Sequence, residues 1–236
     1  MRLFLVISLA LLGSASVALE DVRPKMRPVY EPVTLPDNVA EMRPIRRDRT
    51  MPHTRWAYVQ GSDVWTRVAE AALKDHGATM VATVPNDIDA WCPAYREASD
   101  DDRRAFWVGL LSTLAKHEST FRPRVSGDNG LSHGLFQIRT GTARLYQCRA
   151  RSRAALMDPI ENVSCAIQIM STTVPRDNAV ARKANGTRGG AGADWGPFVQ
   201  RAKREDMRAW VKRQRYCVPI STIRPRARPI EVAEAG

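Results

Sequence analysis

The chain lacks long hydrophobic runs beyond its first residues. The apolar run Leu3–Leu12 follows a positively charged Met1-Arg2 start and is followed by small residues up to Ala18. A membrane-spanning helix needs about 18 or more apolar residues, so this shorter run predicts a cleaved signal peptide over residues 1–18 rather than an anchor. No later stretch is apolar enough to cross a bilayer. We therefore expect no integral membrane span once the signal peptide is removed.

Tight cysteine pairs and histidine pairs are also missing. None of the four cysteines forms a C-x-x-C motif, which structural zinc sites commonly use. His117-Glu118 lacks the second histidine of a zinc-protease helix. We expect neither a metal nor another cofactor.

The four cysteines instead predict disulfides. An even number of cysteines in an exported chain indicates two bridges, for which three pairings are possible. Cys148 and Cys165 lie near the facing ends of two expected helices joined by a short link, so their pairing is geometrically easy. That leaves Cys92 for Cys217, and we expect these two pairs.

Acidic residues are fewer than basic ones. The chain has 36 Lys and Arg against 25 Asp and Glu, for a formal charge of +11, and loss of Arg2 with the signal peptide lowers it by one. A basic exported protein can bind an anionic polymer, such as cell-wall glycan with its acidic peptides, nucleic acid or anionic lipid. The chain has no cluster of aromatic residues for stacking on bases. With an export signal as well, we expect no nucleic-acid partner.

Proline and arginine content divides the chain into three parts after the signal peptide. Residues 19–60 are rich in both and show no apolar period, which predicts a disordered arm. Residues 219–236 are similar and predict a flexible C-terminal tail. Residues 61–218 remain for one compact domain.

Helix signals dominate this domain, and strand signals are weak. The expected helix starts share capping or first-turn chemistry, and they are Ser62, the Ser99–Asp102 run, Asp158 and a position near Pro197. The second of these predicts a helix from Asp102 to Glu118. Met80–Val84 is the best strand candidate. We therefore expect a mainly α fold with little or no sheet.

Glu118 lies in line with an apolar stripe. Trp107, Leu111, Leu114 and Glu118 are spaced i, i+4, i+7 and i+11, which places them on one helical face. Burial and the negative end of a helix both raise a carboxyl pKa, and a glutamate that stays protonated can act as a general acid. The alternative is a helix-end glutamate that bends out to solvent.

A second motif, Gly134–Ile138, contains a glutamine between apolar residues after a glycine that frees the backbone. Its amide can both donate and accept hydrogen bonds, which suits the acetamido and hydroxyl groups of amino sugars. The preceding Ser126–Gly130 stretch is rich in turn residues, so the motif is predicted to lie on a loop that lines a groove.

Several motifs together resemble a known family. In order and spacing these are Glu118-Ser119, Gly134-Leu135-Phe136-Gln137-Ile138, Thr142-Ala143, Asp158-Pro159 and Asn162. They resemble the catalytic domain of soluble lytic transglycosylases, which is itself similar to goose-type lysozyme, and the resemblance covers residues 100–172. It implies a lysozyme-like helical fold. It also implies an enzyme that cleaves peptidoglycan glycan strands between N-acetylmuramic acid and N-acetylglucosamine.

The resemblance also implies roles for individual residues. Glu118 matches the sole catalytic acid/base. Ser119, Gly134, Phe136 and Gln137 match positions at the substrate cleft.

Other positions match a supporting residue or depart from the family pattern. Asn162 matches a helix residue that is more structural than catalytic. Phe136 replaces a methionine and Ala166 a glycine. The family's later Ala-Tyr-Asn-Ala-Gly segment has no clear copy, its nearest counterpart being residues 191–197, so the tyrosine expected to orient the acid is unplaced.

A single carboxyl group favours a reaction assisted by the substrate's own acetamido group, which ends in a 1,6-anhydro sugar. Two alternatives stay open: a muramidase that uses water in the same cleft, and a non-catalytic wall-binding or assembly protein. The expected location is the periplasm, with secretion as the alternative. A cell-envelope assembly or secretion complex is a candidate partner.

Overall fold

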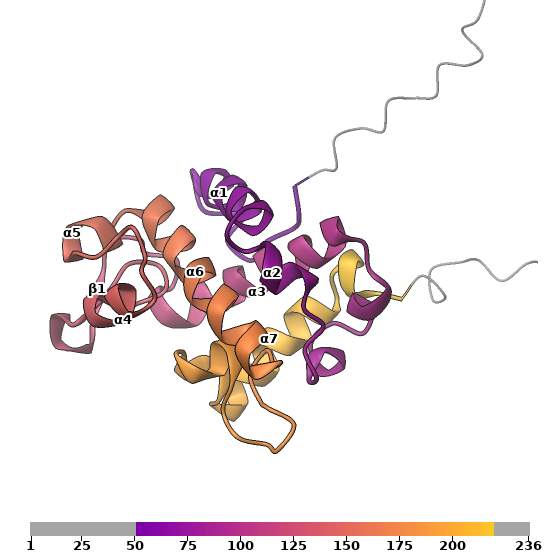
Figure 1. Cartoon of the computed structure of the whole chain (residues 1–236). Coiled ribbons are helices and arrows are strands. Elements are labelled where there is room, and N and C mark those ends of the chain that lie inside the picture. Colours follow the sequence, from indigo (N-terminus) through magenta and orange to yellow (C-terminus); the bar gives the residue numbers. More distant parts are fainter. Residues whose placement is uncertain (1–50, 220–236) are drawn as a thin grey trace, which may run out of the picture. The chain divides into compact units, whose positions relative to one another are not determined.

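The structure of the chain, a computed structural model, describes residues 51–219 (Figure 1). The expected signal peptide, most of the expected arm and nearly all of the expected tail lie outside the described residues. Within them the fold is mainly helical with one small sheet, as the sequence predicts. None of the described helices is long and apolar enough to cross a membrane.

The described region contains seven α-helices, one three-stranded sheet and several short 3-10 turns. The helices are α1 (Ser62–Lys74), α2 (Ala78–Ala82), α3 (Asp100–Ser119), α4 (Thr140–Leu145), α5 (Arg153–Leu156), α6 (Pro159–Asp177) and α7 (Arg201–Lys212). The antiparallel sheet, in the order β1-β2-β3, consists of β1 (Ser126–Gly127), β2 (Ser132–His133) and β3 (Ile138–Arg139). Figure 1 shows the sheet, α4 and α5 grouped on one side of α6, and α7 on the other.

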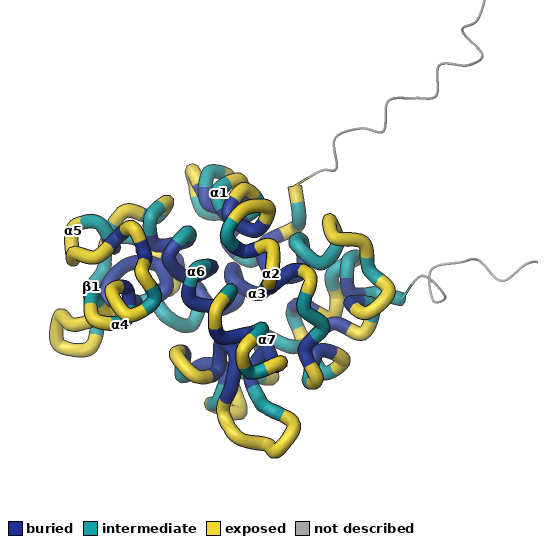
Figure 2. Tube along the Cα trace, in the orientation of Figure 1, coloured by how far each residue is buried: buried dark blue, intermediate teal, exposed yellow. Residues whose placement is uncertain are grey.

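Helix α3 is the centre of the core. Its start is capped by Ser99, whose hydroxyl accepts a hydrogen bond from the Asp102 N–H. From Phe106 to Ala115 every residue is buried (Figure 2), and α1, α2 and α7 pack against it. The apolar stripe recognised in the sequence is thus one side of a helix that is buried all round.

The packed region begins before residue 61, where the sequence placed its boundary. The Trp56 side chain is 0% exposed, and its indole N–H donates to the Thr66 hydroxyl at 2.9 Å. Ser62, expected to cap α1, instead donates its hydroxyl to the Trp56 carbonyl at 2.8 Å. Gly61, with a left-handed φ of 77°, takes the N-cap position. Because the Ser62 hydroxyl forms this bond to Trp56, it does not cap the start of α1.

The predicted strand at Met80–Val84 is wrong. This stretch belongs mostly to helix α2, which packs against α6. One helical turn buries both Met80 and Val81, and no strand of the described chain lies beside them to pair with. Tertiary packing therefore overrides the local strand propensity.

The starts of the last two long helices differ in how well the sequence predicts them. Asp158 caps α6 as expected, accepting the Ile160 N–H at 2.8 Å. The helix expected to begin near Pro197 is instead a short 3-10 turn over Gly196–Phe198, and α7 begins at Arg201.

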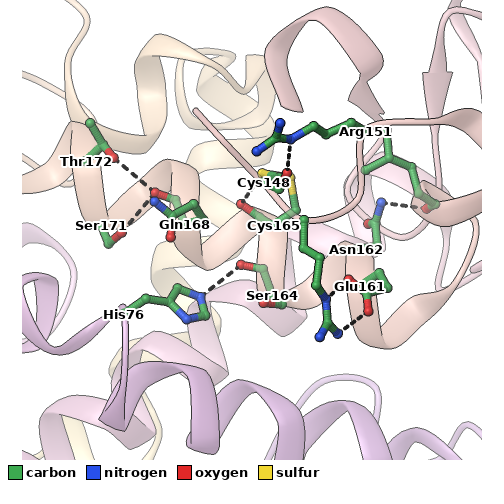
Figure 3. Close-up of a disulfide and its surroundings, with 12 residues drawn as sticks. His76, Cys148, Arg151, Glu161, Asn162, Ser164, Cys165, Gln168, Ser171 and Thr172 are labelled. Atoms are coloured by element: carbon green, nitrogen blue, oxygen red, sulfur yellow. Dashed lines mark hydrogen bonds and ion pairs between the residues drawn. A yellow bond between two sulfur atoms is a disulfide. The ribbon is translucent and has the colours of Figure 1, made fainter. Parts of the chain in front are cut away.

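The two disulfides are Cys148–Cys165 and Cys92–Cys217, which are the pairs that the sequence predicts. Figure 3 shows the first, between the segment after α4 and helix α6, with the Arg151 guanidinium donating to the Cys148 carbonyl at 2.7 Å. The second joins the segment before α3 to the turn after α7. The bridges close loops with sequence separations of 17 and 125 residues.

The long bridge should stabilise the fold more than the short one. The chain-entropy model gives about 5 kcal/mol for the long loop and about 3 kcal/mol for the short one. We therefore expect the Cys92→Ala/Cys217→Ala protein to lose more unfolding free energy than the Cys148→Ala/Cys165→Ala protein. Denaturation in guanidinium chloride measures both, and the opposite ranking would contradict the expectation.

Candidate active site

Glu118 lies in the last turn of α3, just before the chain turns sharply. Thr120 and Phe121 both adopt left-handed backbone conformations, with φ of 54° and 60°, which residues with a side chain rarely do. Their N–H groups donate back to the carbonyls of Lys116 and Ala115. The helix therefore ends at a fixed point directly after the carboxyl-bearing residue.

The Glu118 carboxyl is partly buried and forms no hydrogen bond or ion pair with another described residue. Burial raises its pKa to about 7, and the positive charge of Lys203 opposes that rise. A carboxyl with this pKa is about half protonated at neutral pH, so it can give up a proton and then take one back.

Next to Glu118, the end of α3 is fastened to α7 through Asp206. The Asp206 carboxylate accepts hydrogen bonds from the Arg55 guanidinium at 2.5 and 3.0 Å and lies 2.7 Å from His117 Nε2. The Lys116 ammonium is 3.9 Å away. The hydrogen bond from Arg55 is the main cause that lowers the pKa of Asp206 to about 2. Asp206 is therefore ionised near neutral pH and ties together three segments of the chain.

The Gly134 loop is fastened to α6 by Asn162. The buried Asn162 amide accepts the Phe136 N–H at 2.9 Å and donates to the carbonyls of His133 and Leu156 at 3.1 and 2.8 Å. Gly134 has a φ of 78°, and a Cβ there would lie 2.2 Å from the Leu156 oxygen and 2.4 Å from Asn162 Nδ2. The glycine is needed for this close approach, and Asn162 has the supporting place that the resemblance implies.

The Gln137 amide is used within its own loop. It donates to the carbonyls of Val125 and Gly134 at 3.1 and 2.8 Å and accepts the Ser132 hydroxyl at 3.0 Å. Its φ is 49°, so these bonds hold a left-handed turn. Contact between Gln137 and a substrate stays a prediction.

Ser119 and Phe136 lie below the surface. The Ser119 residue is 3% exposed and its hydroxyl donates to the Ala115 carbonyl. Phe136 is 0% exposed and packs edge-on against Trp56, with 6.5 Å between ring centroids. Both stabilise the elements that carry the site, and their contact with a substrate also stays a prediction.

A pocket opens beside the Gln137 turn. Its lining residues are Gln137, Ile138, Arg139, Thr142, Ile169, Asp194 and Trp195. Asp194 accepts the Tyr146 hydroxyl at 3.1 Å, and burial raises its pKa. The Trp195 indole donates to the Phe136 carbonyl at 2.9 Å. The segment nearest in sequence to the missing tyrosine motif thus borders this pocket.

Arg55, Lys203 and Asp206 are the residues of this region that sequence reasoning missed. Arg55 fell within the arm expected to be disordered, and Lys203 and Asp206 belong to none of the recognised motifs. Since Asp206 is 151 and 89 residues from Arg55 and His117, no local pattern connects them. Among the described residues, no cluster of three or more His, Cys, Asp or Glu could hold a metal ion.

Comparisons with known proteins find one matching family model and several similar structures. The family model of the transglycosylase SLT domain matches residues 97–196. The wild-type structure of DslA from Bdellovibrio is 25% identical, with a TM-score of 0.66, and the match covers 72% of this chain and 100% of that one. A glutamate-to-glutamine variant of DslA gives 27% identity and a TM-score of 0.63 over 68% of this chain and 94% of that one. No curated protein matches the sequence.

The matched segment contains Glu118, the loop over residues 134–138 and its Asn162 anchor. Residues 97–196 of the chain therefore resemble a transglycosylase SLT domain, and the fold is helical and lysozyme-like.

Proposed function

We propose that the protein is a peptidoglycan lytic transglycosylase. It cleaves the β-1,4 bond between N-acetylmuramic acid and N-acetylglucosamine and leaves a 1,6-anhydro-muramic product. The observation that carries the proposal is the Glu118 carboxyl, which lies within an SLT domain, has no hydrogen-bond partner among the described residues and has a pKa raised to about 7.

The electrostatics of Glu118 favour a mechanism with one carboxyl group. Two-carboxylate glycosidases place the pair about 5 to 9.5 Å apart, where a second negative charge raises the pKa of the first. The pKa of Glu118 depends on burial and on Lys203, without a contribution from any carboxylate among the described residues. Asp128, on the nearby loop, is paired with Arg139. This supports a reaction in which the substrate supplies the second group.

The reaction then proceeds in two balanced steps. Glu118 donates its proton to the glycosidic oxygen as the bond to the muramic C1 breaks, and the acetamido carbonyl oxygen of the same sugar bonds to C1 to give an oxazolinium ion. The ionised Glu118 next removes the proton from the C6 hydroxyl. The C6 oxygen bonds to C1, the bond from the acetamido oxygen breaks, and Glu118 is protonated again.

The substrate and location follow from the same features. The two disulfides and the cell-wall-acting domain indicate a place outside the cytoplasm. Within that space we place the protein in the periplasm, where peptidoglycan strands are its substrate. Its positive charge attracts the acidic peptides of the wall, and a complex that crosses the envelope is the kind of partner such a cutting activity would serve.

Replacing the acid should end the reaction. Glu118→Gln keeps the side-chain shape but has no proton to donate, so release of soluble muropeptides from purified peptidoglycan should fall at least about 100-fold. Mass spectrometry of the wild-type products should show muropeptides lighter by one water than hydrolysis would give. The matched control is Glu97→Gln, an exposed glutamate outside the site, which should keep full activity.

The other possible outcomes of this experiment would each support a different function. Products without the missing water would establish a muramidase. A wild-type protein that binds but does not cut peptidoglycan would establish a wall-binding protein. More than a few per cent activity in Glu118→Gln would show that another group is the acid.

Glu118 should also make stability depend on pH. Its folded pKa of about 7 exceeds the ordinary 4.5, so its contribution to stability is complete below pH 4.5 and is lost as pH rises through 7. Glutamine does not ionise. The unfolding free energy of Glu118→Gln, measured relative to that of wild type, should therefore rise by up to about 3 kcal/mol between pH 4.5 and pH 7. Urea denaturation at pH 4.5 and pH 8 measures this. A difference that does not change with pH would mean that the carboxyl is solvated.

A further inference from the structure

Helix α7 lies beyond the matched residues 97–196, yet it packs along the helix that carries Glu118. The two helices run in opposite directions. Midway along α3, a Cβ at Gly109 would lie 3.4 Å from the ring of Trp210, near the end of α7. In the last turn of α3, His117 forms a hydrogen bond with Asp206 of α7. The same register, continued one turn toward the start of α7, brings Lys203 to the end of α3.

Lys203 and Asp206 are three residues apart and so share one face of α7. Asp206 is held by Arg55 and His117, which fixes α7 against α3 and with it the place of Lys203. The Lys203 residue is partly buried and has no ion-pair partner within 4.0 Å in the part of the chain that the structure describes. Its charge nevertheless acts on Glu118. The Lys203 ammonium therefore acts on the Glu118 carboxyl through space and does not form a salt bridge with it.

The other charged groups at this corner are largely compensated. They come from α3 itself, from the segment before α1 and from α7, and they are Lys116, His117, Arg55 and Asp206. The Asp206 carboxylate contacts all three basic side chains. Among the described residues, Lys203 and Arg122, whose Nε–H donates to the Ser119 carbonyl at 3.0 Å, are cations at this corner that Asp206 does not neutralise. Of these two, Lys203 is the one whose charge lowers the pKa of Glu118.

We propose that Lys203 is a positioning residue for the reaction, whose ammonium stabilises the carboxylate that Glu118 becomes after proton donation. This rests on the proposed function. The negative charge on Glu118 exists only between the two proton transfers, and a nearby fixed positive charge favours that state. Lys203 thereby makes Glu118 a stronger acid than burial alone would allow, although it touches neither the substrate nor the bond that breaks.

The test is a set of variants at one position with a control on the same helix. In the full mature chain, Lys203→Met removes the charge and Lys203→Arg keeps it. Lys212→Met removes an exposed lysine from the other end of α7. The readouts are kcat and KM for muropeptide release between pH 4 and 9.

Activity needs protonated Glu118, so it falls as pH rises through the pKa of that group. This fall is the alkaline limb of the pH–activity profile. We expect Lys203→Met to move this alkaline limb upward by about one pH unit and to lower kcat at low pH, because a weaker acid donates less readily. Lys203→Arg should keep the wild-type limb, and Lys212→Met should match wild type. A limb that stays in place would overturn the proposal, as would a rise in KM alone, which would instead indicate that Lys203 binds the substrate.

A direct titration separates this inference from the proposed function. The carboxyl carbon of Glu118, followed by NMR in ¹³C-labelled protein, should titrate at higher pH in Lys203→Met whether or not the protein cuts peptidoglycan. An unchanged midpoint overturns the role of Lys203. A shifted midpoint in a protein without activity supports the coupling of Lys203 to Glu118 and overturns only the transglycosylase assignment.

Discussion

The burial of α3 is the constraint on which the rest of the structure depends. A helix that is covered on every side from Phe106 to Ala115 needs partners all round it, and α1, α2 and α7 supply them. Because the helix emerges from this core only in its last turn, Glu118 is neither fully in water nor fully in the core. Its carboxyl therefore lies in an environment that allows it both to donate a proton and to regain one near neutral pH.

Two separate anchors hold the two parts of the site to this core. Asn162 reaches from α6 to the backbone of the Gly134 loop, and Asp206 reaches from α7 to the last turn of α3. Both work with buried or partly buried polar groups whose partners lie far away in sequence. The segment matched by the family model contains only the first anchor in full; the second is completed by segments before and after it.

The sequence predicts the parts of this fold whose signals are local. The caps at Ser99 and Asp158, the helical class and the pairing of the cysteines follow from composition and spacing. The strand expected at Met80–Val84 fails because its burial is decided by neighbouring helices. For the site, motif order predicts Glu118 as the acid. It does not reveal that the amide of Gln137 closes its own turn, since hydrogen-bond partners are a property of three-dimensional contact.

The Cys92–Cys217 bridge has a consequence for how the protein matures. It encloses α3, the sheet and α7 in one covalent ring, and the second of its cysteines is among the last residues of the domain to be synthesised and translocated. The ring cannot close while the chain is in the reducing cytoplasm, where thiols are kept free. A domain built this way reaches its full resistance to unfolding only after the whole chain has left the compartment in which it was made.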